Sequence, residues 1–306
     1  MTGFVLTLIG NATTAPLEAS HLKRVWQHLE LEGEEHWLAK NEACDLSFDI
    51  TQFSRGDQTA FMEIVRSRAA TALCGTQIDV VCTPTRKRRK KLLVSDMDST
   101  IIDQECIDEL GAAIGLGEQI CQITKAVVSG NISFSDALRQ RMGLMKGMNQ
   151  SLLEKIYQER ITLKTGARTL VQTMAKSGAY CVLVSGGFTF FTSRIARRVG
   201  FDDHMGNELL FDEGKLSGEV KEPIFGRPEK LLALKQLCAQ KTIEIAEVLA
   251  VGDGANDIDM IRGAGLGVAF HGSASLQKQA SAAINHADLT ALLYIQGFSK
   301  NEFVLS

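Results

Sequence analysis

The sequence predicts an α/β protein in which a small α/β sandwich precedes a doubly wound parallel sheet. Three observations support this prediction. Over residues 166–284, short apolar strands alternate with helices, which is typical of a parallel sheet covered on both faces. Residues 1–84 instead give an order of roughly β-α-β-(β)-α-β, which suits a sandwich. Six consecutive basic residues, 86–91, separate the two patterns.

The elements of the first domain, residues 1–84, follow from their apolar patterns. They are a buried strand over 3–9, a helix over 17–31, a β-rich stretch around 44–53, a helix over 58–73 and a short strand over 78–82. These segments carry no catalytic constellation that the sequence reveals.

The basic run RKRRKK at 86–91 has two interpretations. It is typical of a nucleic-acid or localisation patch, or of a solvated linker, here residues 85–91, that self-repulsion keeps extended. The linker is favoured because the run lies where one folded pattern stops and the next begins. The formal net charge of −3 and the lack of interleaved aromatic residues also argue against a nucleic-acid partner.

The second domain, residues 92–306, is expected to hold the parallel sheet. Ligands of such sheets bind at the carboxyl ends of the strands, so motifs at those ends are candidate site residues. The expected elements are a strand over 92–97, mostly helices over 103–165, a helix over 167–177, a strand over 180–184 followed by a helix through residue 198, a hairpin over 207–221 that turns at 212–215, a helix over 227–240, and strands over 246–251, 266–270 and 283–284.

Composition restricts the class of protein further. A length of 306 residues suits two domains, and 45% hydrophobic with 23% charged residues is the balance of a globular protein. The seven cysteines are scattered without a CxxC pair, which favours free thiols in a reducing compartment. The N-terminus lacks the basic segment of a signal peptide, and no stretch reaches the ~20 apolar residues of a spanning helix. We therefore expect a cytoplasmic protein with no membrane partner.

The first candidate motif is DMDST at 96–100, directly after an apolar strand. Residues two apart in an extended chain point the same way, so Asp96 and Asp98 can face one site. Two close carboxylates repel each other unless a cation or a proton lies between them. Taken alone, the pattern is better explained by a pair of aspartates at a strand end or in a turn, which are common.

The second motif is SGGF at 185–188, between a strand and a helix. Glycines let the main chain approach a ligand closely, and amides at a helix N-terminus favour anions. With the Ser185 hydroxyl, these amides could bind phosphate oxygens. Taken alone, the motif is better explained by a glycine-rich turn with a serine cap.

The last two motifs are Lys230, early in the helix over 227–240, and GDGAND at 252–257. The lysine could neutralise phosphoryl charge, although a lysine there is otherwise simply solvated. Asp253 and Asp257 offer hard oxygen ligands, and Mg²⁺ suits a site with few carboxylates completed by water and substrate. A glycine-rich turn with an aspartate cap is the alternative for the hexapeptide.

Together and in this order, the four motifs resemble those of the haloacid-dehalogenase-type phosphatases over residues 92–306. The resemblance implies a Rossmann-like core with a small helical cap at about 103–165. It implies that Asp96 is the nucleophile, that Asp98 is the general acid and base, and that Mg²⁺ is the cofactor. The metal contacts that it implies come from Asp96, Asp98, Asp253 and Asp257. The phosphate contacts that it implies come from Ser185, Gly186, Lys230 and Asn256.

Three longer segments resemble the phosphoserine phosphatases in particular. They are DMDSTIIDQECIDE (96–109), FSDALRQRMGLMKG (134–147) and VGDGANDIDM (251–260). In that family the position of Glu105 binds the substrate ammonium, the position of Arg141 binds its carboxylate, and Phe134 matches an apolar cap residue over the substrate. An arginine fork suits a carboxylate. The resemblance therefore implies phosphoserine as the small-molecule partner, whereas without it Glu105 and Arg141 would be expected on the surface of the cap.

Longer phosphoserine phosphatases carry an ACT-like regulatory domain where residues 1–84 lie here, and the expected order of elements is compatible with one. Residues 9–16, IGNATTAP, only loosely resemble the loop that often binds an amino acid in such domains. ACT-like domains often pair, so a homodimer through this domain is compatible with the resemblance. Two alternatives stay open: a Mg²⁺-dependent phosphatase of another phosphorylated metabolite or of phosphoserine in a protein, and an amino-acid-sensing regulatory protein.

Overall fold

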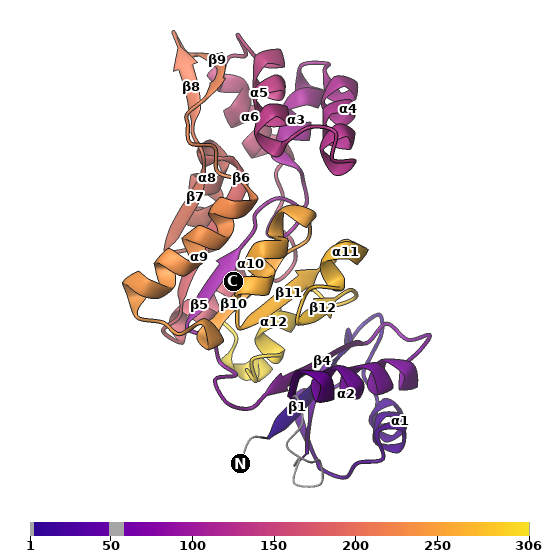
Figure 1. Ribbon diagram of the computed structural model, residues 1–306. Helices are drawn as coiled ribbons and strands as arrows, with labels where there is room; N and C mark the ends of the chain where they lie inside the picture. Colours follow the sequence, from indigo (N-terminus) through magenta and orange to yellow (C-terminus); the bar gives the residue numbers. More distant parts are fainter. Residues whose placement is uncertain (1–2, 49–57, 306) are drawn as a thin grey trace.

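The computed structural model describes residues 3–48 and 58–305. The elements of its first domain are β1 (Phe4–Ile9), α1 (Ala19–Leu29), β2 (Glu34–Ala39), β3 (Ala43–Phe48), α2 (Gln58–Ala72) and β4 (Asp79–Pro84). The strands form an antiparallel sheet in the order β2-β3-β1-β4, and α1 and α2 lie side by side against it (Figure 1). Apolar side chains from the helices and the sheet face beneath them form one core, because neither layer can bury its apolar face alone.

The expected order of elements in this domain is confirmed, with two differences in detail. The stretch expected around 44–53 is strand up to Phe48, and residues 49–53 lie outside the described part of the chain. The sequence did not locate β2, because four of its six residues are exposed and the strand shows no alternation of buried and polar positions.

The second domain contains a six-stranded parallel sheet in the order β12-β11-β10-β5-β6-β7. Its strands are β5 (Leu92–Ser95), β6 (Tyr180–Phe188), β7 (Asp203–Asn207), β10 (Val248–Gly252), β11 (Leu266–Phe270) and β12 (Ala282–Ile284). The helices around it are α7 (Ala167–Lys176), α8 (Thr189–Val199), α9 (Arg227–Lys241), α10 (Ile258–Gly263), α11 (Ala274–Gln277) and α12 (Ala291–Tyr294). The doubly wound fold is therefore confirmed, and β5 lies between β10 and β6, the strands that lead into the other motifs.

The cap region is helical, as expected. Its helices are α3 (Cys106–Ala113), α4 (Gly117–Val128), α5 (Phe134–Leu144) and α6 (Gln150–Arg160). The expected hairpin is also present, as β8 (Leu209–Asp212) and β9 (Lys215–Val220), with positive φ at Glu213 and Gly214 in its turn. The hairpin lies beside the cap, since β9 packs on α5 and the main chains of Gly147 and Leu216 are hydrogen-bonded (Figure 1).

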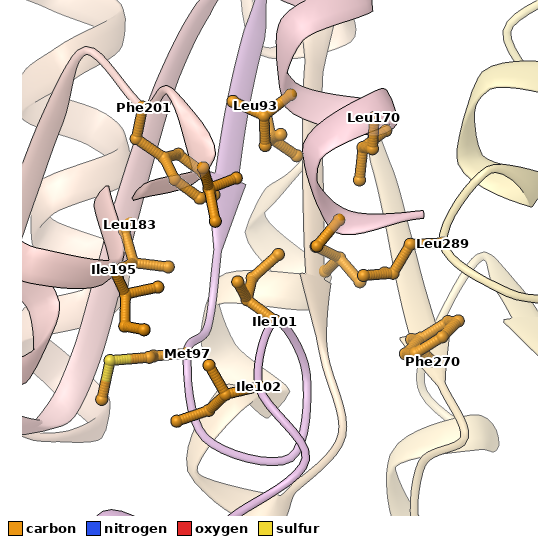
Figure 2. Packing of buried hydrophobic residues seen from close by; sticks show 14 of the residues in the cluster. Leu93, Met97, Ile101, Ile102, Leu170, Leu183, Ile195, Phe201, Phe270 and Leu289 are labelled. Atoms are coloured by element: carbon orange, nitrogen blue, oxygen red, sulfur yellow. The ribbon is translucent and has the colours of Figure 1, made fainter. Parts of the chain in front are cut away.

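A continuous apolar core fixes the loop that follows β5. Met97, Ile101 and Ile102 are completely buried in the same cluster as Leu93 and Leu183 of the sheet. Figure 2 shows these loop residues next to side chains from the strands and from α7 and α8. Because closely packed side chains tolerate little displacement, this anchoring holds the candidate motif between them in one position.

The basic run is a folded connection, so the prediction of a solvated, self-repelling linker was wrong. Arg88 forms a bidentate pair with Asp45 at 2.6 and 2.7 Å, and its guanidinium also donates to the main-chain oxygens of Tyr294 and Ile295. The neighbouring ion pairs are Lys87–Glu244, Arg89–Glu302 and Lys91–Glu247. The sequence shows six like charges in a row but not the acids that the fold brings to them.

The carboxylate of Asp79, at the start of β4, joins the domains at a second place. It accepts hydrogen bonds from the main-chain N–H groups of Asn285, His286 and Ala287 at 2.7 to 3.0 Å. The two domains are therefore in direct, hydrogen-bonded contact. Across the described ranges, no helix has the length and apolar character needed to span a membrane.

Candidate active site

Asp96 lies where the chain leaves β5. Its N–H donates to the Val251 oxygen at 3.0 Å, which continues the pairing of β5 with β10 for one more residue. Its own Oδ1 accepts from the Met97 N–H at 2.8 Å. The residue is only 3% exposed, so one carboxylate is held firmly inside the carboxyl end of the sheet.

Asp98 is bound by a different set of partners. Its Oδ1 accepts from the Cys106 N–H at 3.0 Å, and its Oδ2 accepts from the Ser185 hydroxyl at 3.2 Å. Ser99 adopts a left-handed conformation, which turns the chain towards the cap after the two aspartates. Asp98 therefore connects the β5 loop with the end of β6 and with the first turn of α3.

Lys230 connects the first motif with the last. Its Nζ lies 2.7 Å from Asp96 Oδ1 and 2.7 Å from Asp257 Oδ1, and the lysine side chain has no solvent exposure. Lys230 lies at the first turn of α9. Pro228 favours the start of that helix, and the Glu229 carboxylate caps it by accepting a hydrogen bond from the Gly226 N–H.

Asp253 and Asp257 complete a group of three carboxylates. One oxygen of each of Asp96, Asp253 and Asp257 lies within 4.8 Å of the others. The Thr100 hydroxyl donates to Asp253 Oδ1 at 3.1 Å, and the Gly254 N–H donates to Asp257 Oδ2 at 3.1 Å. These bonds hold the carboxylates close together despite their mutual repulsion.

The electrostatics of this group follow from burial and from the imbalance of charge. Burial first, and then the charge of Asp257, raise the pKa of Asp96 well above its usual range, although Lys230 opposes the shift. Burial also raises the pKa of Asp98, and burial with the charge of Asp257 raises the pKa of Asp253 to about 6. Burial alone would lower the pKa of Lys230, but the charges of Asp257 and Asp96 raise it above its usual value. The site therefore holds more negative charge than its single buried lysine compensates.

The motif at 185–188 is the end of strand β6 rather than a separate turn. The register between β6 and β7 shifts between Val184 and Phe188, and α8 begins at Thr189. The Gly187 N–H donates to the Ser185 hydroxyl at 2.9 Å, and a Cβ at residue 187 would lie 3.0 Å from Asp98 Oδ2. Glycine thus lets the main chain approach Asp98 closely.

The ring of Phe134, the first residue of α5, covers this end of the sheet. A Cβ added to Gly186 would lie 2.9 Å from Phe134 Cζ, and one added to Gly226 would lie 3.1 Å from its Cδ1. The ring therefore lies in a space that two glycines leave open. The cap and the core meet at this ring, directly beside the expected phosphate site.

Glu105 directly precedes α3, and Arg141 is a buried residue of α5. The Ser99 hydroxyl donates to Glu105 Oε1 at 2.7 Å. Burial of the carboxylate and then the charge of Asp98 raise the pKa of Glu105 to about 8, although the residue as a whole is exposed. Arg141 is 7% exposed and donates from Nη2 to the Thr124 hydroxyl at 3.0 Å.

Arg141 lacks a full set of partners. Its Nε is buried and has no hydrogen-bond partner, and no ion pair of Arg141 occurs within residues 3–48 and 58–305. Burial lowers its pKa, while the charges of Asp108 and Glu105 oppose this effect. A buried guanidinium without a carboxylate partner costs free energy, and a bound anion would offset that cost.

The structure brings most of the expected site residues together at one edge of the sheet, but Asn256 is exposed and forms no side-chain hydrogen bond within the described residues.

Sequence reasoning missed three supporting residues. Thr100 and Thr124 bind Asp253 and Arg141, and Asn207 donates to the oxygens of Gly186 and Phe225 at 2.8 and 2.9 Å. Thr100 lies within DMDST and could have been examined there, whereas Thr124 and Asn207 are marked by no local pattern.

The fold and the site define a haloacid dehalogenase-like hydrolase. The family model of that description matches residues 93–262, more than half of the chain, and the chain belongs to this family.

Three proteins similar to this chain carry the name phosphoserine phosphatase. The phosphoserine phosphatase of Archaeoglobus fulgidus is 40% identical over 217 residues, which are 70% of this chain and 63% of that protein, less than two thirds of its length. The phosphoserine phosphatase of Streptomyces coelicolor is 32% identical over 298 residues, which are 97% of this chain and 71% of that protein. A solved phospho-aspartyl intermediate analogue of phosphoserine phosphatase is 34% identical, with a TM-score of 0.63, and the match covers 67% of this chain and 98% of that one.

Proposed function

We propose that this protein is a phosphoserine phosphatase, which hydrolyses O-phospho-L-serine to L-serine and phosphate as the last step of serine biosynthesis. Its family and the names of its similar proteins support the proposal. The single observation that carries the choice of substrate is the buried Arg141, whose Nε has no hydrogen-bond partner. A buried guanidinium without a hydrogen-bond partner at Nε suits the carboxylate of an amino acid, and the Glu105 carboxyl group, once ionised, suits its ammonium.

The proposed orientation of the substrate follows from where these groups lie. The phosphate lies at the carboxyl end of the sheet, near the Ser185 hydroxyl, the Gly186 amide and Lys230. The carboxylate is bound by Arg141, whose planar fork can donate two parallel hydrogen bonds. The ammonium is bound by Glu105, and the Phe134 ring covers the seryl carbon atoms and excludes water.

The chemistry of the carboxylate group fits Mg²⁺. Three carboxylates lie within 4.8 Å of one another, and burial with mutual repulsion raises the pKa of Asp96 despite the adjacent lysine. Mg²⁺ prefers such oxygen ligands, which would be Asp96, Asp253, the main-chain oxygen of Asp98 and, at the edge of the shell, Asp257. When bound, the ion would offset the repulsion and polarise the phosphoryl oxygens.

The proposed reaction has two steps. Asp96 attacks the phosphorus atom in line, the bond from phosphorus to the seryl oxygen breaks, and Asp98 donates its proton to that oxygen. Water then attacks the aspartyl phosphate, Asp98 accepts a proton from it, and the bond from phosphorus to Asp96 breaks. The raised pKa of Asp98 favours the protonated form that the first step requires. Positioning and electrostatics supply most of the rate in phosphoryl transfer.

The proposal extends to the rest of the chain. The first domain, with its order β1-α1-β2-β3-α2-β4, is proposed to be ACT-like and regulatory, and to pair in a homodimer. All seven cysteines are free, which supports a cytoplasmic location. The Asn256 side chain has no hydrogen-bond partner within the described residues, so it is free to contact a bound substrate. We propose that it contacts the phosphate.

The test is phosphate release from O-phospho-L-serine, with and without Mg²⁺, against a panel of other phosphate esters. We expect Mg²⁺-dependent release with a strong preference for phosphoserine. Release that prefers another ester would retain the chemistry of Asp96 and overturn the assignment of Glu105 and Arg141. No release from any ester would favour an amino-acid-sensing protein instead.

A further inference from the structure

A second pocket lies at the junction of the two domains, away from the candidate active site. Its volume is about 290 Å³, and its lining includes Thr83, Arg86, Lys90, Ile245 and Leu266. Ile245 begins the short 3-10 helix Ile245–Glu247 that leads into β10, and Leu266 begins β11, so the pocket is at the amino ends of these strands. The aspartates of the active site follow the carboxyl ends of β5 and β10.

The Thr83 hydroxyl faces this junction without a partner. Thr83 is 4% exposed, and its Oγ1 forms no hydrogen bond in the described structure. Side chains alternate along a strand, so Thr83 shares a face of β4 with Val81 and Asp79. Val81 belongs to the core of the second domain, and Asp79 binds main-chain N–H groups of that domain. The Thr83 side chain is therefore on the face of β4 that meets the second domain, and Thr83 lines the pocket.

The charge of the pocket is positive and only partly compensated. Arg86 is exposed, and Lys90 donates to the main-chain oxygens of Lys87 and Ala246. Within residues 3–48 and 58–305, neither Arg86 nor Lys90 forms an ion pair, since Glu247 is paired with Lys91. Burial lowers the pKa of Lys90 to about 8, with Glu247 opposing the shift, as expected for a cation that lacks a close counter-charge.

The remaining surface of the pocket is apolar. Pro84, Ile245 and Leu266 line it beside the polar groups, and Ile245 is 43% exposed. A pocket with apolar walls and a few convergent polar groups is the usual form of a small-molecule site. Arg88 also lines the pocket, but its guanidinium is already bound to Asp45 and to main-chain oxygens.

We propose that this pocket binds a small organic anion with one carboxylate or phosphate group on an apolar body. The anionic group is bound by the Thr83 hydroxyl, Arg86 and Lys90. The apolar body lies on Ile245 and Leu266. The site is independent of the proposed activity, because it shares no residue with the active site.

The experiment measures binding of four probes to the full-length protein by saturation-transfer NMR: benzoate, phenylphosphonate, inorganic phosphate and neutral benzyl alcohol. We expect benzoate, phenylphosphonate or both to bind better than benzyl alcohol and inorganic phosphate. Arg86→Gln and Thr83→Val should each weaken that binding about tenfold, because each removes a hydrogen bond to a charged group. Arg89→Gln removes the same charge three residues further along the chain, where Arg89 pairs with Glu302 and does not line the pocket, and should leave binding unchanged.

Thermal unfolding separates a binding role of Thr83 from a structural one. A buried hydroxyl without a partner costs free energy, so Thr83→Val should leave the Tm of the ligand-free protein unchanged or higher while it weakens binding. The exposed Arg86→Gln variant should fold normally and tests the site even if Thr83→Val does not. The proposal is overturned if neither aromatic anion binds, if their binding is insensitive to Arg86→Gln, or if benzyl alcohol binds equally well.

Discussion

The ammonium of Lys230 and the carboxylate of Asp257 form a 2.7 Å ion pair in which neither side chain has any solvent exposure. The same ammonium lies 2.7 Å from the proposed nucleophile, Asp96. Lys230 therefore serves both the stability of the fold and the proposed chemistry, because it is the cation that both buried carboxylates contact. A change at this residue should affect both properties, and the two effects can be separated.

Lys230→Met should reduce the free energy of unfolding by about 3–5 kcal/mol in the absence of Mg²⁺, because it leaves buried carboxylates unpaired. The double variant Lys230→Met/Asp257→Asn should regain part of that loss, since it removes one of the uncompensated charges, but it should stay inactive. Urea unfolding of both variants measures the difference. Lys235→Met, on the exposed side of the same helix, is the control and should change stability by less than about 0.5 kcal/mol. Equal stability of Lys230→Met and the native protein would contradict the argument.

Asp96→Asn should abolish the covalent intermediate, because an amide cannot act as the nucleophile. Asp98→Asn should still be phosphorylated, slowly, and should hydrolyse the intermediate poorly, with a loss in kcat of about 10²–10⁴-fold. Acid quenching followed by mass spectrometry of the intact protein detects the added phosphoryl group. Near-normal turnover by Asp96→Asn would show that another residue is the nucleophile.

The raised pKa of Glu105 predicts a pH dependence of substrate recognition. Its pKa in the free protein is about 8, so below that pH the carboxyl group is mostly neutral and cannot pair with an ammonium. kcat/KM reports ionisations of the free enzyme, so its value for phosphoserine should rise with pH up to about 8 and then level. Glu105→Gln should have a lower kcat/KM without this rise.

A matched substrate provides the control for Glu105. 3-Phosphoglycerate has a hydroxyl where phosphoserine has its ammonium, and it keeps the carboxylate and the phosphate. Any residual activity with it should lack the Glu105-dependent rise and should change little in Glu105→Gln. The same rise with both substrates would assign the ionisation to a different group.

The main elements of the site could be predicted from sequence because each motif directly follows or precedes a recognisable element. Apolar strands end at Ser95 and Gly252, and Asp96 and Asp253 each follow directly. The sequence could not show that Lys230 bridges Asp96 and Asp257, because that contact depends on how α9 packs against the sheet. Asn207 was missed for the same reason: its amide binds two main-chain segments that meet only in the folded protein.

The errors in the fold have a similar origin. Local charge predicted an extended linker at 86–91, but the structure places Asp45, Glu244 and Glu302 beside it. Strand β2 was not located, because most of its residues are exposed and its own sequence shows no strand pattern. Its place in the sheet depends on its pairing with β3. Patterns within one element were informative, whereas contacts between distant segments were not.

The contact between Phe134 and Gly186 predicts a steric effect on the cap. Gly186→Ala should place a methyl group 2.9 Å from the Phe134 ring and displace it, which should reduce kcat/KM by up to about 10²-fold. Phe134→Ala should also reduce kcat/KM, because it uncovers the substrate. In the double variant the methyl group meets no ring, so the effects should be far from additive. Steady-state kinetics of the three variants measures this, and additive losses would contradict the proposed contact.

The Arg88–Asp45 pair predicts how the two domains unfold. The Arg88 and Asp45 side chains are only 14% and 6% exposed, so Arg88→Met leaves a buried carboxylate without its cation and should cost about 3–5 kcal/mol. The cost falls on the first domain and on its junction with the second, so the two domains should no longer unfold together. Arg89→Met, which breaks a half-exposed pair, should cost less than about 1 kcal/mol.

Two probes separate the domains in a urea titration. Both tryptophans, Trp26 and Trp37, lie in the first domain, so tryptophan fluorescence reports that domain, while phosphatase activity reports the second. In the native protein the two transitions should coincide, because the ion pair and the hydrogen bonds of Asp79 couple the domains. In Arg88→Met the fluorescence transition should come first and activity should persist to higher urea. Coincident transitions in Arg88→Met would mean that the remaining contacts between the domains are sufficient to couple them.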